Sequence, residues 1–172
     1  MIAVCGPGEA TEAEIRIAEA VGERIARAGH AVVCGGRGGV MAAACRGAKH
    51  AGGTTIGIIP GYDRSGANPW VDHVICTGLG EARNALVVAS GESVIAIGGG
   101  FGTLSEIGLA LKLGKCVVAI QSWELEESRI LGLAKGRTRY LQARTADEAV
   151  AMALAADDTR EHSLGMPPSG HG

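Results

Sequence analysis

The sequence is expected to fold as an α/β domain with one doubly wound parallel sheet of about six to seven strands and helices on both faces. Short apolar runs alternate along the chain with segments of helical periodicity, which is the pattern of repeated βα units. The runs are apolar throughout, as a parallel sheet covered on both faces requires. Glycine makes up 28 of the 172 residues and is concentrated where these runs end. The backbone is therefore expected to approach a ligand closely there.

In the first half of the chain, apolar runs place four strands and helical periodicity places two helices. The strands are expected at residues 2–5, 31–34, 54–59 and 71–76, and the helices at residues 11–28 and 40–52. Thr11 and Glu14 have the spacing of a capping box, and Gly29 stands where a C-terminal cap belongs. Residues 60–70 show no periodicity and are expected to form an irregular loop, in a position to cover a pocket as a lid.

The second half of the chain completes the sheet. Strands are expected at residues 93–97 and 116–120, with a weaker seventh at 140–142, and helices at 81–90, 103–113 and 145–155. No internal repeat or linker divides the chain, so residues 1–160 are expected to form one domain. Residues 161–172 include two prolines and are expected to be a disordered tail.

Composition argues against several classes of protein. The formal net charge of −2 and the 3% content of aromatic residues do not suit a nucleic-acid-binding surface. No apolar run is long enough to span a membrane, and no basic segment begins a secretory signal, so a cytoplasmic location is expected. The five cysteines form no C-x-x-C pair and the histidines no H-x-x-x-H pair, so neither a disulfide framework nor a metal site is expected.

Three glycine-rich turns, at residues 6–8, 35–39 and 98–103, each join a predicted strand to a predicted helix. In a parallel sheet such turns meet at the carboxyl edge, where helix N-termini bind phosphate groups. Tight turns also need glycine for shape alone, but three together favour a bound phosphate. The candidate ligand-binding residues are Gly6, Gly8, Gly35, Gly36, Gly39, Gly99, Gly100, Gly102, Thr103 and Asn84. The second strand ends without an acidic residue, which disfavours a dehydrogenase.

Two charged residues stand in apolar surroundings, each early in a predicted helix. Glu106 shares a helix face with Thr103, whereas the stripe that includes Ile107 is expected to pack on the sheet with Leu104 and Leu111. Glu106 is therefore expected at the mouth of the pocket, although a carboxylate there could merely complement the helix dipole. Arg83 could pair with a phosphate through two hydrogen bonds or be an ordinary surface arginine.

Four segments carry a resemblance to a known family. Residues 98–106, GGGFGTLSE, resemble the P-G-G-x-G-T-x-x-E signature of the LOG (Lonely Guy) family, and residues 80–84, GEARN, resemble its M-x-x-R-K segment. Residues 34–41 and 57–60 are similar to two further fingerprints of the family. The resemblance implies a Rossmann-like nucleotide-binding domain and a homodimer or homotetramer. It also implies hydrolysis of a nucleoside 5′-monophosphate to free base and ribose 5-phosphate, with Arg83 and Glu106 as the catalytic residues.

Departures from the signature leave a second function open. Gly98 replaces the signature proline, Gly80 the methionine and Asn84 the lysine. The chain thus resembles a divergent branch that includes the molybdenum cofactor carrier proteins, which hold a pterin phosphate without turning it over. No cofactor is required for the hydrolase, and the pocket is expected to hold a nucleotide monophosphate or the molybdenum cofactor.

The cysteines and the helix composition raise two further alternatives. Cys5, Cys34 and Cys76 end predicted strands, so they are either thiol ligands for molybdenum or, as is commoner, small buried apolar residues. The apolar helices at 81–90 and 103–113 would also suit a structural or signalling module that acts through oligomerisation.

Overall fold

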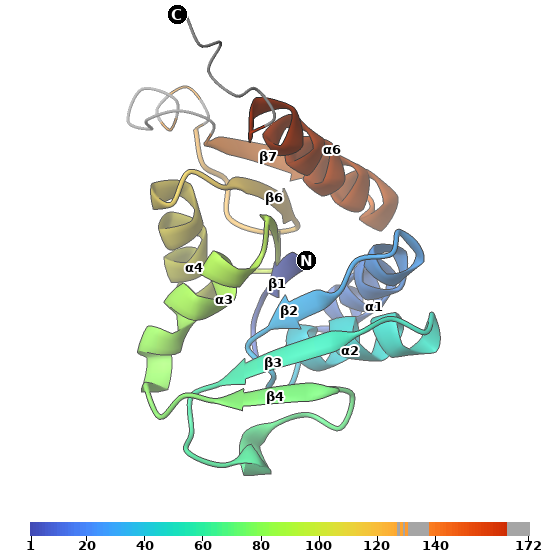
Figure 1. The fold of residues 1–172 in the computed structure, drawn as a ribbon, viewed down its shortest axis with the longest axis vertical. Coiled ribbons are helices and arrows are strands. Elements are labelled where there is room, and N and C mark those ends of the chain that lie inside the picture. Colours follow the sequence, from blue (N-terminus) through green and yellow to red (C-terminus); the bar gives the residue numbers. More distant parts are fainter. Residues whose placement is uncertain (127, 129, 131–137, 165–172) are drawn as a thin grey trace, which may run out of the picture.

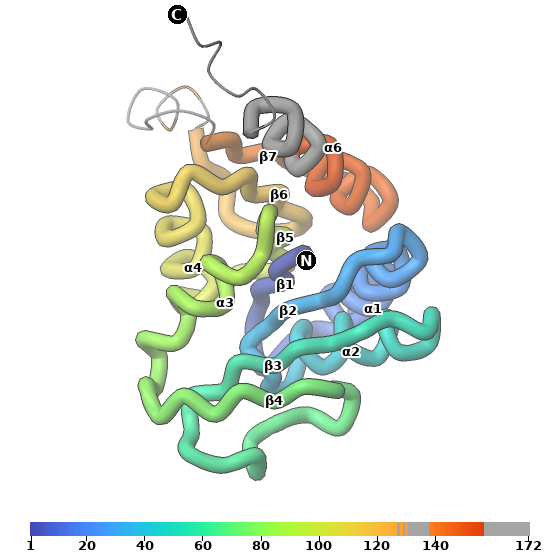
Figure 2. Tube along the Cα trace, in the orientation of Figure 1, coloured from blue at the N-terminus to red at the C-terminus, as the bar shows by residue number. Residues whose placement is uncertain are grey.

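Seven strands form one parallel sheet, which confirms the predicted α/β architecture. A computed structural model describes residues 1–126, 128, 130 and 138–164, and the sheet order is β4-β3-β2-β1-β5-β6-β7 (Figure 1). The strands are β1 (Ile2–Cys5), β2 (Val32–Cys34), β3 (Thr55–Ile59), β4 (His73–Cys76), β5 (Ser93–Ile97), β6 (Cys116–Ile120) and β7 (Arg139–Ala143). From β1 the chain moves outward to β4, returns to β5 on the other side of β1, and moves outward again (Figure 2).

The described helices cover both faces of the sheet (Figure 1). Helices α1 (Glu12–Arg27), α2 (Val40–His50) and α6 (Ala146–Leu164) pack on one face, and α3 (Asn84–Ser90) and α4 (Phe101–Lys112) on the other. Alternate residues of β1 point to opposite faces of the sheet. Ile2 and Val4 belong to the core under α1, and Ala3 and Cys5 belong to the core under α3 and α4. The strands are apolar throughout because both of their faces are buried in this way.

The predicted capping box forms at the start of α1. The Thr11 hydroxyl accepts a hydrogen bond from the Glu14 backbone N–H, and the Glu14 carboxylate accepts one from the Thr11 N–H, which completes the capping box. Gly29, just past the helix, has a φ of +79°. None of the described helices combines the length and the apolar character that a membrane crossing needs.

Three elements differ from their predicted form. β4 is shorter than predicted and largely exposed, because it is the edge strand of the sheet. A 3-10 turn, η2 (Gly80–Arg83), occupies the first residues of the predicted helix 81–90. Helix α6 continues past residue 155 to Leu164, since no glycine or proline interrupts residues 146–164. The end of the predicted tail, residues 165–172, lies outside the described residues.

Candidate functional site

A pocket of about 470 Å³ opens at the carboxyl ends of β1, β2 and β5, where the strand order reverses. This is the position at which doubly wound sheets bind their ligands, and the volume suits a small organic molecule. The lining residues are Gly6, Pro7, Gly8, Glu9, Arg37, Gly38, Met41, Glu81, Arg83, Asn84, Gly100, Gly102, Thr103 and Glu106. Segments that are far apart in the sequence therefore meet at this edge of the sheet.

Most of the predicted site residues line this pocket. Those that line the pocket are Gly6, Gly8, Arg83, Asn84, Gly100, Gly102, Thr103 and Glu106. The remaining four do not line it: Gly35, Gly36 and Gly39 allow close packing behind it, and Gly99 is exposed. A Cβ at Gly39 would lie 2.3 Å from the Pro7 carbonyl oxygen, so this glycine lets the first two turns touch. Whether these glycines contact a ligand stays a prediction.

Arg83 is a buried cation without a full set of partners. Its side chain, at the end of η2, is only 5% exposed. Its Nε and Nη1 atoms are buried and have no hydrogen-bond partner in the described part of the chain. The guanidinium lies beside Gly35, where an added Cβ would be 2.1 Å from Nη1. Buried N–H groups of a cation are costly when unpaired, and an acceptor in the pocket would pair with them.

Glu106 lies in the same pocket and is 6% exposed. Burial raises the pKa of its carboxyl to about 7, against the opposing effect of the Arg83 charge and a hydrogen bond with the Cys5 thiol. Burial and the nearby Glu106 charge in turn raise the pKa of Cys5 well above its ordinary value. The thiol is therefore protonated at neutral pH and donates to the carboxylate. Glu106 can both give and accept a proton near pH 7.

The pocket contains charges that the sequence did not single out. Arg37 belongs to the second glycine turn, and Glu81 belongs to the segment that precedes Arg83. Together with Arg83, Glu9 and Glu106 they give the pocket two guanidinium groups and three carboxyl groups. A ligand that suits this pocket carries both an anionic group and hydrogen-bond donors.

The third glycine turn is held by an aromatic side chain that the sequence analysis missed. The indole N–H of Trp123 donates a hydrogen bond of 3.3 Å to the Gly100 carbonyl, and the Tyr140 hydroxyl donates one to the Trp123 carbonyl. Gly98, which opens this turn, has a φ of +66°. Proline cannot adopt that angle, so the departure from the signature changes the backbone of the turn and not merely a side chain.

No cysteine lines the pocket, although three were considered as thiol ligands. Cys5 and Cys34 are buried and Cys76 is exposed on the edge strand. The Cys34 and Cys45 sulfur atoms are 3.5 Å apart, and the Gly36 N–H donates to Cys34 Sγ at 3.3 Å. Within the described residues, no three His, Cys, Asp or Glu side chains lie together in a way that could hold a metal ion.

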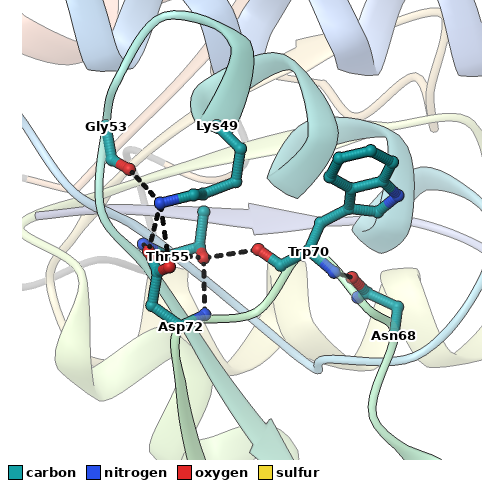
Figure 3. Close-up of polar contacts among 6 residues, drawn as sticks. All are labelled: Lys49, Gly53, Thr55, Asn68, Trp70 and Asp72. Carbon is teal, nitrogen blue, oxygen red and sulfur yellow. Dashed lines mark hydrogen bonds and ion pairs between the residues drawn. The ribbon is translucent and has the colours of Figure 1, made fainter.

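The loop after β3 is fixed at its second half, which does not suit the predicted lid. The Asp72 carboxylate pairs with Lys49 Nζ and accepts a hydrogen bond from the Thr55 backbone N–H at 3.0 Å (Figure 3). The Thr55 hydroxyl donates to the Trp70 carbonyl at 2.7 Å. Asn68 Nδ2 donates to the Gly36 and Arg37 carbonyls at 3.1 and 3.0 Å. Residues 68–72 are thus a wall that positions the second glycine turn.

Comparisons with known proteins are consistent with this geometry. The model of the SLOG cluster4 family, LDcluster4, matches residues 1–150. An uncharacterized protein of Archaeoglobus fulgidus is 46% identical over 120 residues, which are 70% of this chain and 79% of that protein.

Two solved structures share the fold over nearly the whole chain. One is the molybdenum cofactor binding protein of the phototrophic bacterium Rippkaea orientalis, with a TM-score of 0.81 and 39% identity. The match covers 90% of this chain and 94% of that chain. The other is the molybdenum cofactor carrier protein of Chlamydomonas reinhardtii, with a TM-score of 0.80 and 37% identity. In that case the match covers 90% and 96% of the two chains.

Proposed function

The chain belongs to the SLOG cluster4 family, and on that premise we propose that it is a carrier protein that holds the molybdenum cofactor without turning it over. The family match confirms the resemblance to LOG-like proteins expected from the glycine-turn residues. Two proteins named for this cofactor are 37–39% identical over 90% of the chain, which supports the choice of ligand.

The observation that carries the proposal is the Arg83 guanidinium, which is buried in the pocket with two nitrogen atoms that no described residue pairs. The pterin of this cofactor carries a phosphate, which would supply the missing acceptors. The backbone N–H groups at the start of α4, at Gly102 and Thr103, lie on the same wall and favour an anion. Since no cysteine lines the pocket, the proposed hold on the cofactor is through its phosphate and ring, and no thiol ligates the molybdenum.

Retention of the cofactor by a matched pair of variants tests this proposal. Molybdenum cofactor released from a molybdoenzyme is mixed with protein without oxygen, and bound pterin and molybdenum are measured after gel filtration. Arg83→Met removes the buried cation, and Arg16→Met removes an exposed one on α1. We expect the wild type and Arg16→Met to retain cofactor and Arg83→Met to retain at least about tenfold less. Equal retention by Arg83→Met would overturn the proposal.

A second candidate function, nucleoside 5′-monophosphate phosphoribohydrolase, is favoured by Glu106. A carboxyl group with a pKa of about 7 beside a buried guanidinium suits general acid–base chemistry. In this mechanism the glycine turns hold the 5′-phosphate and Arg83 orients the nucleotide. Glu106 activates the water that attacks the sugar while the base departs.

Incubation with AMP and an N6-substituted AMP separates the two functions. Chromatography follows the release of free base by the wild type and by Glu106→Gln. Release that disappears in Glu106→Gln would establish the hydrolase and displace the carrier proposal. Absence of release, together with cofactor retention that depends on Arg83, is the result we expect.

We further propose that the protein assembles as a homodimer or homotetramer. Ile75 on β4, Leu79 before η2 and Leu86 on α3 are exposed apolar side chains on neighbouring elements. Burial of such side chains against a second copy is favourable. Light scattering is expected to give a mass of at least twice 17.4 kDa, and a monomer would contradict this proposal.

A further inference from the structure

A second pocket, of about 260 Å³, lies at the carboxyl end of β3 and shares Arg37 with the first pocket. We infer that it is the subsite for the planar heterocycle of the bound phosphate compound, with Tyr62 as the surface on which that ring stacks. This inference rests on the proposed function and extends it, because it assigns the two ends of the ligand to two different pockets. Ile59 and Pro60 supply an apolar part of this pocket, and Asp63 and Ser65 a polar part.

The Tyr62 ring is supported on one side and open on the other. Its side chain is 90% exposed, an unusual position for a tyrosine that has no aromatic partner within the described residues. The ring lies against Gly78, where an added Cβ would be 2.3 Å from Tyr62 Cε1. Gly78 has a φ of +64°, and any side chain at this position would overlap the ring. An aromatic ring with one free face suits stacking on a planar ligand.

Backbone hydrogen bonds join the loop that carries Tyr62 to the loop that carries Gly78. The Gly78 N–H donates to the Gly61 carbonyl at 3.0 Å, and the Gly80 N–H donates to the Pro60 carbonyl at 3.2 Å. The Asp63 carboxylate accepts from the Ser65 N–H at 2.9 Å and caps the short 3-10 turn η1 (Arg64–Gly66). The two loops that carry and support Tyr62 are therefore joined before any ligand binds, which lowers the entropic cost of stacking.

Arg37 lines both pockets, and its backbone is held in place. The Asn68 side chain donates to the carbonyls of Gly36 and Arg37, and the Asn68 N–H donates to the Gly36 carbonyl at 2.8 Å. A ligand with its phosphate at Arg83 and its ring on Tyr62 would pass along Arg37. A pterin phosphate and a purine nucleotide share this chemistry, since each joins a planar heterocycle to a phosphate.

Calorimetric titration of the full chain with three probes tests the assignment. Neopterin phosphate and guanosine 5′-monophosphate carry a ring and a phosphate, whereas ribose 5-phosphate lacks the ring. Tyr62→Ala removes the stacking surface, and Tyr62→Phe retains it. Leu113→Ala is the control, because Leu113 is an apolar residue just past α4 that is 52% exposed and lines neither pocket.

We expect Tyr62→Ala to weaken both ring-bearing probes by about tenfold and to leave the affinity for ribose 5-phosphate unchanged. Tyr62→Phe and Leu113→Ala should bind all probes as the wild type does. Which of the two ring-bearing probes binds more tightly identifies the preferred heterocycle.

Three results would overturn the subsite. Unchanged binding of the ring-bearing probes by Tyr62→Ala would do so, as would a wild type that binds ring-bearing probes no tighter than ribose 5-phosphate. In both cases the anion pocket of the proposed function would still stand. A wild type that binds none of the three probes would overturn the subsite and the proposed function together.

Discussion

Gly35 leaves the space into which the Arg83 guanidinium extends. A Cβ at position 35 would lie 2.1 Å from Nη1 and 2.8 Å from Cζ of Arg83. Since these atoms form the end of a flexible side chain, we expect Gly35→Ala to fold normally but to displace the guanidinium. Affinity for ribose 5-phosphate in calorimetry should then fall about tenfold, with Gly108→Ala as the control for the substitution itself. Unchanged affinity would show that the guanidinium does not contact the phosphate.

Glu106 makes stability depend on pH in a direction opposite to that of an ordinary carboxylate. Its pKa is about 7 in the folded protein and about 4.5 in the unfolded chain. The folded state therefore binds more protons between these values, so the contribution of Glu106 to stability falls as pH rises through this range. Between pH 5 and pH 8 we expect the free energy of unfolding to fall by about 2–3 kcal/mol on this account.

Urea unfolding of the wild type and Glu106→Gln across this pH range checks that expectation. The amide keeps the size of the side chain and cannot ionise, so the variant should lack this part of the pH dependence. Asp72 and Glu19, whose carboxyl pKa values are lowered, act at lower pH and are common to both proteins. Parallel curves for the two proteins would contradict the raised pKa.

Glu106 could be predicted from the sequence because it is a charge among apolar residues just after a glycine turn, and Arg83 because it is a charge at the start of an apolar helical segment. Arg37 and Glu81 gave no comparable signal, since charges in turns are commonly solvated. Tyr62 could not be recognised either. Its role depends on the backbone of Gly78, and a strand and two loops separate the two residues along the chain.

The strands were the most predictable elements, because burial on both faces leaves a continuous apolar run. The buried face of α4 was predicted only in part. Ile107 packs on the sheet as expected, but Leu104 and Leu111 are only partly buried, and Thr103 and Glu106 are the buried side chains near the helix start. The pocket takes the place of the core at this end of the helix, so polar residues occupy positions that periodicity alone assigns to apolar ones.

Close contact between α1 and α2 depends on glycine within the helices. A Cβ at Gly47 would lie 1.9 Å from the Glu19 carbonyl oxygen, which belongs to the backbone and cannot move independently. On α4, by contrast, Gly108 is exposed and an added Cβ would have no neighbour within 4 Å. We expect Gly47→Ala to lower the free energy of unfolding by about 1–3 kcal/mol or more. Gly108→Ala should raise it by about 0.5–1 kcal/mol.

Chemical unfolding of these two variants measures both effects with one kind of substitution. The same change from glycine to alanine is thus expected to change the free energy of unfolding in opposite directions in the two helices, because only Gly47 has a neighbouring backbone in the way. Destabilisation by Gly108→Ala, or a neutral Gly47→Ala, would mean that the packing of these helices differs from that described.

The pocket lies between the two halves of the sheet. Gly6 and Gly38 follow β1 and β2, whereas Arg83 comes from η2, which contacts β3 and α3, and Glu106 comes from α4, which contacts β5. A ligand that contacts both sides joins them, so it stabilises the whole fold by mass action. The same arrangement makes the free protein less stable than it could be, because Arg83 is buried before any anion is present.

Replacement of Arg83 by methionine should therefore stabilise the free protein. The same replacement should abolish the rise in melting temperature that a ligand causes. At pH 6, where Glu106 is largely protonated, loss of the unpaired guanidinium is expected to raise the melting temperature by about 5 °C. Guanosine 5′-monophosphate should raise the melting temperature of the wild type and of Arg16→Met but not that of Arg83→Met. A free Arg83→Met protein that melts below the wild type would mean that the guanidinium stabilises the fold itself. In that case the buried charge would be a structural feature and not a binding group held ready for an anion.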